Sequence, residues 1–495
     1  MTRKLLILII ISVFISAGCT LAPEYTRPDA PIPDEWPTGD AYGEIETSVY
    51  ERSVPELTWQ EFFTDERLRK IIESALDNNR DLRLAALNVE KVRALYGVQR
   101  ASLFPAVDVV GSGNKERVPA DLSSTGRRMT SEKYGVNLGI TSWEIDFFGR
   151  IRSLKDQALE EYLATEQGLR GAQISLISAV VEAYLNLAAD RGNLRLARST
   201  LETQEAAYGI IKRRYEVGVA TELDLRQAQT QVEAARVNVA RYTQLTAQDR
   251  NALNLLAGLP VPEELLPEDL SNVISPKDIF PGLSSEVLLG RPDIMAAEHR
   301  LKGTYAFIGA ARAALFPRIS LTTAIGTASA DLSGLFESGQ GTWSFAPRIT
   351  MPIFDARSWA ALRVSKAEKE IALTSYERAI QGAFREVADA LAARGTVDQQ
   401  AEAQQSLVDA VAEAYRLSNA RYMRGIDSYL SVLDAHRSLY SSQQGLIALR
   451  LAKLISQVRL YAALGGGATG NNDERQKRQN PNETVKVDSR NDAQQ

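Results

Sequence analysis

The sequence predicts an α+β membrane protein in which each protomer holds two tandem repeats of a helix, a β-hairpin and a long helical pair. Three observations predict this fold class: an internal repeat, two long stretches without proline, and short segments of alternating polarity. Together they place short strands and very long helices in the same order twice along 495 residues.

The internal repeat organises the chain between its ends. Identical residues recur 212 positions apart early in each repeat, as in Leu103-Phe104-Pro105 and Leu315-Phe316-Pro317. Later in each repeat the spacing is 207, as between Gly218 and Gly425. A shorter loop tip explains the loss of five positions, because loops tolerate deletions.

The repeat also predicts how the whole chain is divided. We expect a first repeat over residues 66–270 and a second over residues 271–467. An extended leader over residues 19–65 precedes them, because Pro, Asp, Glu and Thr dominate that segment. A disordered polar tail over residues 468–495 follows, since Asn, Gln, Arg and Asp are frequent there.

Very long helices are expected in both repeats. Residues 149–259 and 353–480 contain no proline and are dense in Ala, Leu, Glu, Gln and Arg. The clear interruption in each stretch is a glycine, Gly218 or Gly425, which suits a helix end followed by a turn. The helix before Gly218 would run about 65 residues, or about 100 Å, and therefore requires neighbouring helices packed along its length.

The alternating segments predict four strands, over about 105–118, 133–147, 317–330 and 341–353. One face is apolar and the other is polar or small, the pattern of a membrane β-barrel with a wet lumen. A half-buried sheet of a soluble domain alternates in the same way, but the very long helices favour the barrel. The residues expected to face lipid are Tyr134, Val136, Leu138, Trp343, Phe345 and Ile349.

Four strands are too few to close a membrane barrel, because single-chain barrels of this kind have at least about eight. An open edge within lipid leaves backbone groups without hydrogen-bond partners, so other copies must complete the barrel. Three copies would give twelve strands, and the arithmetic alone also allows two or four copies.

The N-terminus looks like a bacterial lipoprotein signal. Arg3 and Lys4 precede a short apolar run, and small residues then lead directly to Cys19, the only cysteine. We therefore expect a signal peptide over residues 1–18 and acylation of Cys19, although Ser16 departs from the residue usual at that position. An ordinary cleavage site with an incidental cysteine is the alternative.

Composition argues against several classes of protein. The net charge of −5 does not suit a nucleic-acid-binding protein, which needs a basic face. Two histidines and one cysteine leave almost no ligands for a Cys/His metal site. No Walker loop, dinucleotide-binding turn or catalytic constellation occurs, so we expect no cofactor, no metal and no enzymatic activity.

The chain resembles the TolC-like outer-membrane factors of tripartite efflux pumps, and most closely their lipoprotein branch. The resemblance covers roughly residues 19–467 and rests on Cys19 with Pro23-Glu24-Tyr25-Thr26-Arg27-Pro28, Asn79-Arg80-Asp81-Leu82-Arg83, Asp146-Phe147-Phe148-Gly149-Arg150, Arg291-Pro292-Asp293-Ile294, Ala310-Ala311-Arg312-Ala313 and Ala463-Leu464-Gly465-Gly466-Gly467. It implies a homotrimer in the outer membrane, with a twelve-stranded barrel continued by a periplasmic α-helical barrel. It also implies two protein partners, a periplasmic adaptor and an inner-membrane pump.

The resemblance further implies a gate at the narrow helical end, where a ring of aspartates closes the duct in this family. Asp434 occupies the matching place, and Asp224 and Asp427 are weaker candidates. The alternative is that Asp434 simply lies on a solvated helix face. The helix-tip turns expected to meet the adaptor contain Gly218, Gly425, Tyr215 and Tyr422.

The function expected from these features is a passive exit duct for drugs, solvents or other small molecules. A duct for protein secretion is a variant that the sequence leaves open. A structural coiled-coil lipoprotein would explain the helices and the lipid but not the paired strands.

Overall fold

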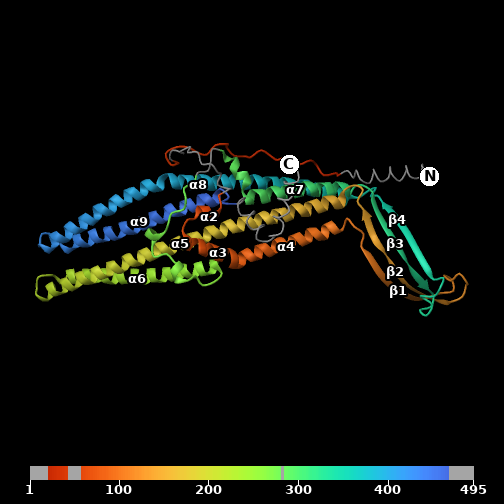
Figure 1. Cartoon of the computed structure of the whole chain (residues 1–495), viewed down its shortest axis with the longest axis horizontal. Helices are drawn as coiled ribbons and strands as arrows, with labels where there is room; N and C mark the ends of the chain where they lie inside the picture. The colour runs from red at the N-terminus through yellow and green to blue at the C-terminus, as the bar shows by residue number, and fades with distance from the viewer. Residues whose placement is uncertain (1–19, 43–56, 280–283, 468–495) are drawn as a thin grey trace, which may run out of the picture. The chain divides into compact units, whose positions relative to one another are not determined.

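The computed structural model describes residues 20–42, 57–279 and 284–467. The expected signal peptide, Cys19 and the polar tail lie outside the described residues. The predicted order of helix, β-hairpin and long helical pair is confirmed in both repeats (Figure 1).

The first repeat begins with helices and ends in the first helical pair. Its elements are α2 (Trp59–Phe62), α3 (Glu66–Asn78), α4 (Arg80–Ala101), β1 (Val107–Val118), β2 (Met129–Ile145), α5 (Arg150–Glu216) and α6 (Glu222–Ala257). The second repeat follows three short 3-10 helices, η2 (Glu263–Leu265), η3 (Leu270–Asn272) and η4 (Ser285–Gly290). Its elements are α7 (Pro292–Ala313), β3 (Arg318–Ser329), β4 (Gly341–Thr350), α8 (Ala356–Met423) and α9 (Tyr429–Ala463).

The first repeat is expected to open with one helix, but it opens its long helical part with two, because Asn79 separates α3 from α4. The Asn79 side chain accepts a hydrogen bond from the backbone N–H of Leu82 at 2.9 Å and donates one to the Leu256 carbonyl at 3.0 Å. An asparagine that caps a new helix in this way takes an extended backbone conformation and stops the preceding helix.

The chain divides into two compact units that do not follow the two sequence repeats. The sheet unit falls within Met1–Asp29, Asn88–Glu166 and Ala296–Tyr376, and it contains all four described strands. The helical unit falls within Ala30–Leu87, Gln167–Met295 and Glu377–Gln495. Each unit therefore takes corresponding parts from both repeats.

The four strands form one antiparallel sheet in the order β1-β2-β3-β4, as Figure 1 shows. Its register aligns Val109, Leu138, Ile325 and Trp343 in one row across all four strands. Residues directly opposite one another point to the same side of a sheet. Hence the six residues expected to face lipid share one side, termed the apolar face.

The opposite side, termed the small polar face, carries short side chains. One of its rows consists of Asp108, Gly139, Ala324 and Ser344. A Cβ atom added at Gly139 would overlap the carbonyl oxygen of Thr323, which shows how closely β2 and β3 approach on this side. Close packing of backbones on one face is expected where a sheet coils strongly.

The apolar face is not packed against the core of this chain. Trp343 is 79 % exposed and Ile349 is 70 % exposed. A soluble half-buried sheet would cover such residues with its own helices, since exposed contiguous apolar patches mark interaction or membrane surfaces. The exposure therefore favours the membrane interpretation over the soluble one.

A bulge in β2 keeps its apolar residues on one face. The register shifts between Ile140 and Trp143, and Ser142 adopts a positive φ of 61°. The extra residue lets Trp143 pair with Leu321 and thus rejoin the apolar face. Without it, every residue beyond Ile140 would point to the other side.

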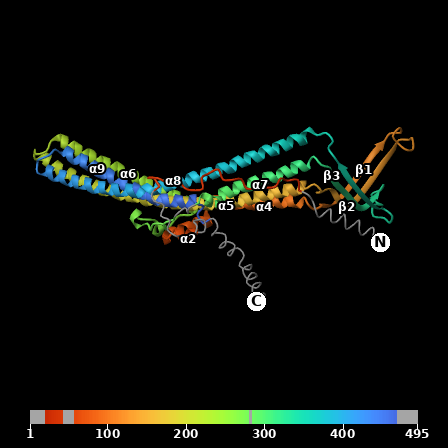
Figure 2. The same cartoon turned by 90° about the horizontal axis from the view of Figure 1, so that it is seen from above.

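The helical unit contains the turns that join α5 to α6 and α8 to α9, and these turns lie at the same end of the unit in both views (Figure 2). The α5 helix has 67 residues, close to the predicted length. One apolar stretch of α5 would be long enough to cross a membrane, but half of that stretch is buried within the protein. Packing of residues such as Val180 and Tyr184 in the core accounts for its apolar character.

Candidate functional site at the turn end of the helical unit

The turn after α5 is set by Gly218, which has a φ of 78°. Its N–H donates to the Tyr215 carbonyl at 2.9 Å, and the next N–H, of Val219, donates to the Arg214 carbonyl at 2.8 Å. This pair of bonds is a Schellman motif, which satisfies the last carbonyls of a helix and requires a left-handed residue.

The turn after α8 repeats this geometry at the positions 207 residues later. Gly425 has a φ of 73°, its N–H donates to the Tyr422 carbonyl at 2.9 Å, and the Ile426 N–H donates to the Arg421 carbonyl at 3.0 Å. Both glycines therefore end a long helix, as the sequence predicts.

A buried cluster joins the four helices next to these turns. It consists of Ile211 from α5, Ala228 from α6, Tyr422 from α8, and Tyr429, Val432 and Leu433 from α9, and we call it the tyrosine cluster. The rings of Tyr422 and Tyr429 lie 5.2 Å apart, and the Arg214 guanidinium lies 5.1 Å from the Tyr422 ring centre. Burial raises the pKa of Tyr429 to about 12, so its hydroxyl stays neutral at physiological pH.

The two tyrosines of the turns have different environments. Tyr215 is 40 % exposed, whereas its repeat partner Tyr422 is 9 % exposed within the tyrosine cluster. As an adaptor contact, Tyr422 has little surface to offer, because its ring packs inside the protein. Tyr215 remains available beside the exposed Val217 and Val219.

Asp224 serves the fold of the turn. Its carboxylate accepts hydrogen bonds from the Thr221 backbone N–H at 3.0 Å and hydroxyl at 2.8 Å, while Thr221 caps the Asp224 N–H at 3.1 Å. This reciprocal capping box starts α6. The Asp224 carboxylate is therefore occupied by hydrogen bonds that cap the first turn of α6.

Asp427 is held by an arginine from the preceding helix. Arg421 donates to both carboxylate oxygens, at 2.5 and 2.9 Å, and so clips the turn after α8. Hydrogen bonding to Arg421 lowers the pKa of Asp427 below its usual range. Asp427 therefore keeps its charge at mildly acidic pH.

Asp434 is the most exposed of the three aspartates, with its side chain 66 % exposed. The nearest described cation is Arg437, at 3.8 Å on the same helix. Val432 and Leu433 enter the tyrosine cluster, so the following residue points away from it. The carboxylate is left facing solvent in the single chain.

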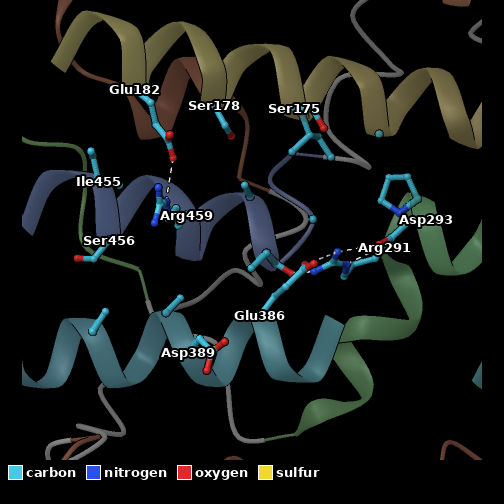
Figure 3. Close-up of a pocket in the computed structure, with 18 of the residues that line it drawn as sticks. Ser175, Ser178, Glu182, Arg291, Asp293, Glu386, Asp389, Ile455, Ser456 and Arg459 are labelled. Atoms are coloured by element: carbon cyan, nitrogen blue, oxygen red, sulfur yellow. Dashed lines mark hydrogen bonds and ion pairs between the residues drawn. The ribbon is translucent and has the colours of Figure 1, made fainter. Parts of the chain in front are cut away.

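A cavity of about 970 Å³ lies elsewhere in the helical unit, and no pattern in the sequence indicates it. Figure 3 shows Arg291, Asp293 and Glu386 pointing toward one another at its edge. The Arg291 side chain donates to Asp293 at 2.7 Å, to Glu386 at 2.9 Å and to the Ala463 carbonyl. Arg291 thus links the start of α7 to α8 and to the end of α9. The Arg291-Pro292-Asp293-Ile294 motif therefore has a structural role.

Comparison with known proteins identifies the family. The family described as outer membrane efflux protein matches residues 71–259 and 283–466. The chain belongs to the outer membrane efflux protein family. The resemblance to the TolC-like outer-membrane factors is confirmed, and this efflux protein resides in the outer membrane.

Relatives and solved structures match this efflux protein over almost its whole length. It is 48 % identical over 468 residues to the toluene efflux pump outer membrane protein TtgC of Pseudomonas putida, covering 94 % of this chain and 96 % of that protein. The same values hold for the antibiotic efflux pump outer membrane protein ArpC of Pseudomonas putida. The open state of the MtrE outer membrane channel of Neisseria gonorrhoeae matches with a TM-score of 0.80 and 38 % identity, covering 91 % of this chain and 99 % of that one.

Within this efflux protein, the structure brings some predicted site residues together and separates others. The two glycines, Tyr215 and Tyr422 lie at the two helix ends described above, and two of the three aspartates are engaged there by capping or ion pairing. Cys19 lies outside the described residues. Described residues contain no group of three or more His, Cys, Asp and Glu side chains able to hold a metal ion.

Proposed function

We propose that this efflux protein is the passive exit duct of a tripartite system and works as a homotrimer with a periplasmic adaptor and an inner-membrane pump. Toluene and antibiotics in the names of two relatives support small organic molecules as its cargo. The duct itself needs no cofactor, because the pump would supply the energy.

The observation that carries the proposal is the sheet. Its edge strands β1 and β4 have one neighbour each among the described strands, and its apolar face is exposed. Strands of 10 to 17 residues are long enough to span a bilayer, which needs about 9–11 residues per tilted strand. Three copies would join these edges into twelve strands with the small polar face around the lumen. A coiled-coil lipoprotein would have no use for such a sheet.

The proposal predicts that the purified protein crosslinks as a trimer in detergent and forms ion-conducting channels in a planar bilayer. Single-channel conductance is the measurement, and detergent buffer without protein is the control. Conductance should be measurable but limited by the closed helical end, because the twelve-stranded lumen lined by short side chains is wet and does not itself block ions. A stable, monodisperse monomer without conductance would overturn both the trimer and the duct.

We further propose that Cys19 is acylated after removal of residues 1–18. Mass spectrometry of the mature N-terminus should show an acyl-modified cysteine, and Cys19→Ala should abolish the added mass. More than one acyl chain is expected, because a single chain gives only marginal membrane binding. An unmodified terminus at another residue would refute the anchor without affecting the duct.

A further inference from the structure

The leader lies directly on α7 in the sheet unit. Arg312 donates a hydrogen bond to the Leu21 carbonyl at 3.0 Å. A Cβ atom added at Gly309 would lie only 2.8 Å from the backbone nitrogen and side chain of Ala22, so this glycine makes room for the leader. The first described residues of the leader are therefore fixed against one helix.

A buried carboxylate fixes the same leader a few residues later. Glu298, only 4 % exposed, accepts hydrogen bonds from Arg27 at 2.7 and 3.2 Å and from the Tyr25 hydroxyl at 3.0 Å. Lys302 lies 3.0 Å from the same carboxylate. Burial works to raise the pKa of Glu298, but these donors together lower it, so the carboxylate is charged and firmly paired.

Beside the fixed leader lies a cavity of about 370 Å³, termed the basic cleft. Its lining residues are Pro23, Tyr305, Ile308, Arg312, Lys366, Ala367, Lys369 and Glu370. Three cations face one carboxylate, and that carboxylate lies 3.2 Å from Lys369. Glu370 thus forms an ion pair with Lys369. Only one guanidinium nitrogen of Arg312 donates a hydrogen bond to the leader. The cleft therefore combines excess positive charge with an apolar wall.

The leader also indicates how close the basic cleft lies to the lipid headgroups. Only Thr20 separates Leu21 from Cys19, and two residues span at most about 7 Å. If the proposed acylation of Cys19 holds, its acyl chains lie in the bilayer, so the Leu21 carbonyl and Arg312 lie close to the lipid headgroups. The cations of the cleft are then at the level of phosphate groups.

We propose that the basic cleft binds the phosphate of an anionic phospholipid in the leaflet that holds the acyl chains of Cys19. Arg312 and Lys366 would contact the phosphate oxygens, for which guanidinium and ammonium groups are suited. Pro23, Tyr305 and Ile308 would contact the glycerol and the first carbons of the acyl chains. This inference rests on the proposed lipid anchor and adds a specific lipid site to it.

The test is native mass spectrometry of the purified full-length protein titrated with phosphatidylglycerol. Wild type should retain up to one lipid per protomer beyond its covalent acyl groups. Lys366→Glu should weaken retention at least about fivefold, the effect of a single cation near an anionic surface. Arg363→Glu is the matched control, because it changes the same charge on the same exposed stretch of α8 outside the cleft lining.

Each outcome bears on the inference. Equal losses for Lys366→Glu and Arg363→Glu would reduce the effect to general surface charge and overturn the site. Displacement of phosphatidylglycerol by an excess of inorganic phosphate would show a site for free phosphate instead of a lipid. The covalent acyl mass is read from the same spectra, so a missing anchor is distinguished from an acylated protein that retains no lipid.

Discussion

Trp343→Arg is expected to reduce assembly of the trimer in the outer membrane, whereas Ser344→Arg at the next position should be tolerated. Both residues are exposed on β4 in the single chain, so neither change should affect the fold of the protomer itself. The two substitutions should therefore differ only because one side chain faces the bilayer and the other faces the lumen. An arginine on a barrel's lipid face costs up to about 2–4 kcal/mol, most at the middle of the bilayer, while a lumen position accepts it.

The same contrast is expected in the inner strands. Val136 lies on the apolar face, opposite Thr327, and Asn137 lies on the small polar face, opposite Gly326. Val136→Arg should therefore reduce the trimer fraction in outer-membrane extracts far more than Asn137→Arg. Crosslinking followed by gel analysis measures that fraction. Similar losses for both members of each pair would mean that the sheet does not meet lipid with the face assigned here.

The two faces of the sheet were predictable because their signal is local. A side chain's position in a strand alternates with period two, so apolar and small residues in sequence report directly on the face they occupy. The glycine turns were predictable for a similar reason. The residue that ends such a helix adopts a left-handed backbone conformation, which has little steric cost only for glycine. Gly218 and Gly425 meet this condition through their own backbone angles.

Other features depend on contacts between residues far apart in the sequence, which local sequence patterns do not reveal. Ser142 makes a bulge because Trp143 pairs with Leu321 on another repeat, and nothing in the local alternation marks the extra residue. Asn79 begins α4 by accepting a hydrogen bond from the nearby Leu82 N–H, but the Leu256 carbonyl that its amide also reaches lies far along the chain. Tyr215 and Tyr422 occupy equivalent positions, yet only Tyr422 meets Tyr429 and the Arg214 guanidinium.

The candidate gate shows the same division between local and distant information. Three aspartates near the turns are evident from the sequence, but which of them the fold would use is not. The capping box occupies Asp224, and Arg421 occupies Asp427. Because hydrogen bonds lower the pKa of Asp427, the stability of its ion pair is present above the unfolded pKa and is lost as the pH falls through the lower folded pKa.

Asp434→Ala is expected to raise the resting conductance of the trimeric channel and to weaken its block by divalent cations. Threefold symmetry would bring three copies of this carboxylate together near the turn end, where like charges attract counter-ions. A ring of one sign raises local cation concentration at least about tenfold, so the blocking concentration of Mg²⁺ should rise by a similar factor when the ring is removed.

Three features make this test discriminating. Asp434 is solvent-facing and makes only a long ion pair with Arg437, so its removal should leave trimer stability unchanged. Asp409→Ala is the matched control, because Asp409 is an exposed helical aspartate about 24 Å before Gly425 along α8. Planar-bilayer recordings with and without Mg²⁺ measure both effects. If Asp434→Ala conducts and is blocked like wild type, the gating role passes to Asp427 or Asp224, and the Arg421 ion pair becomes the next contact to break.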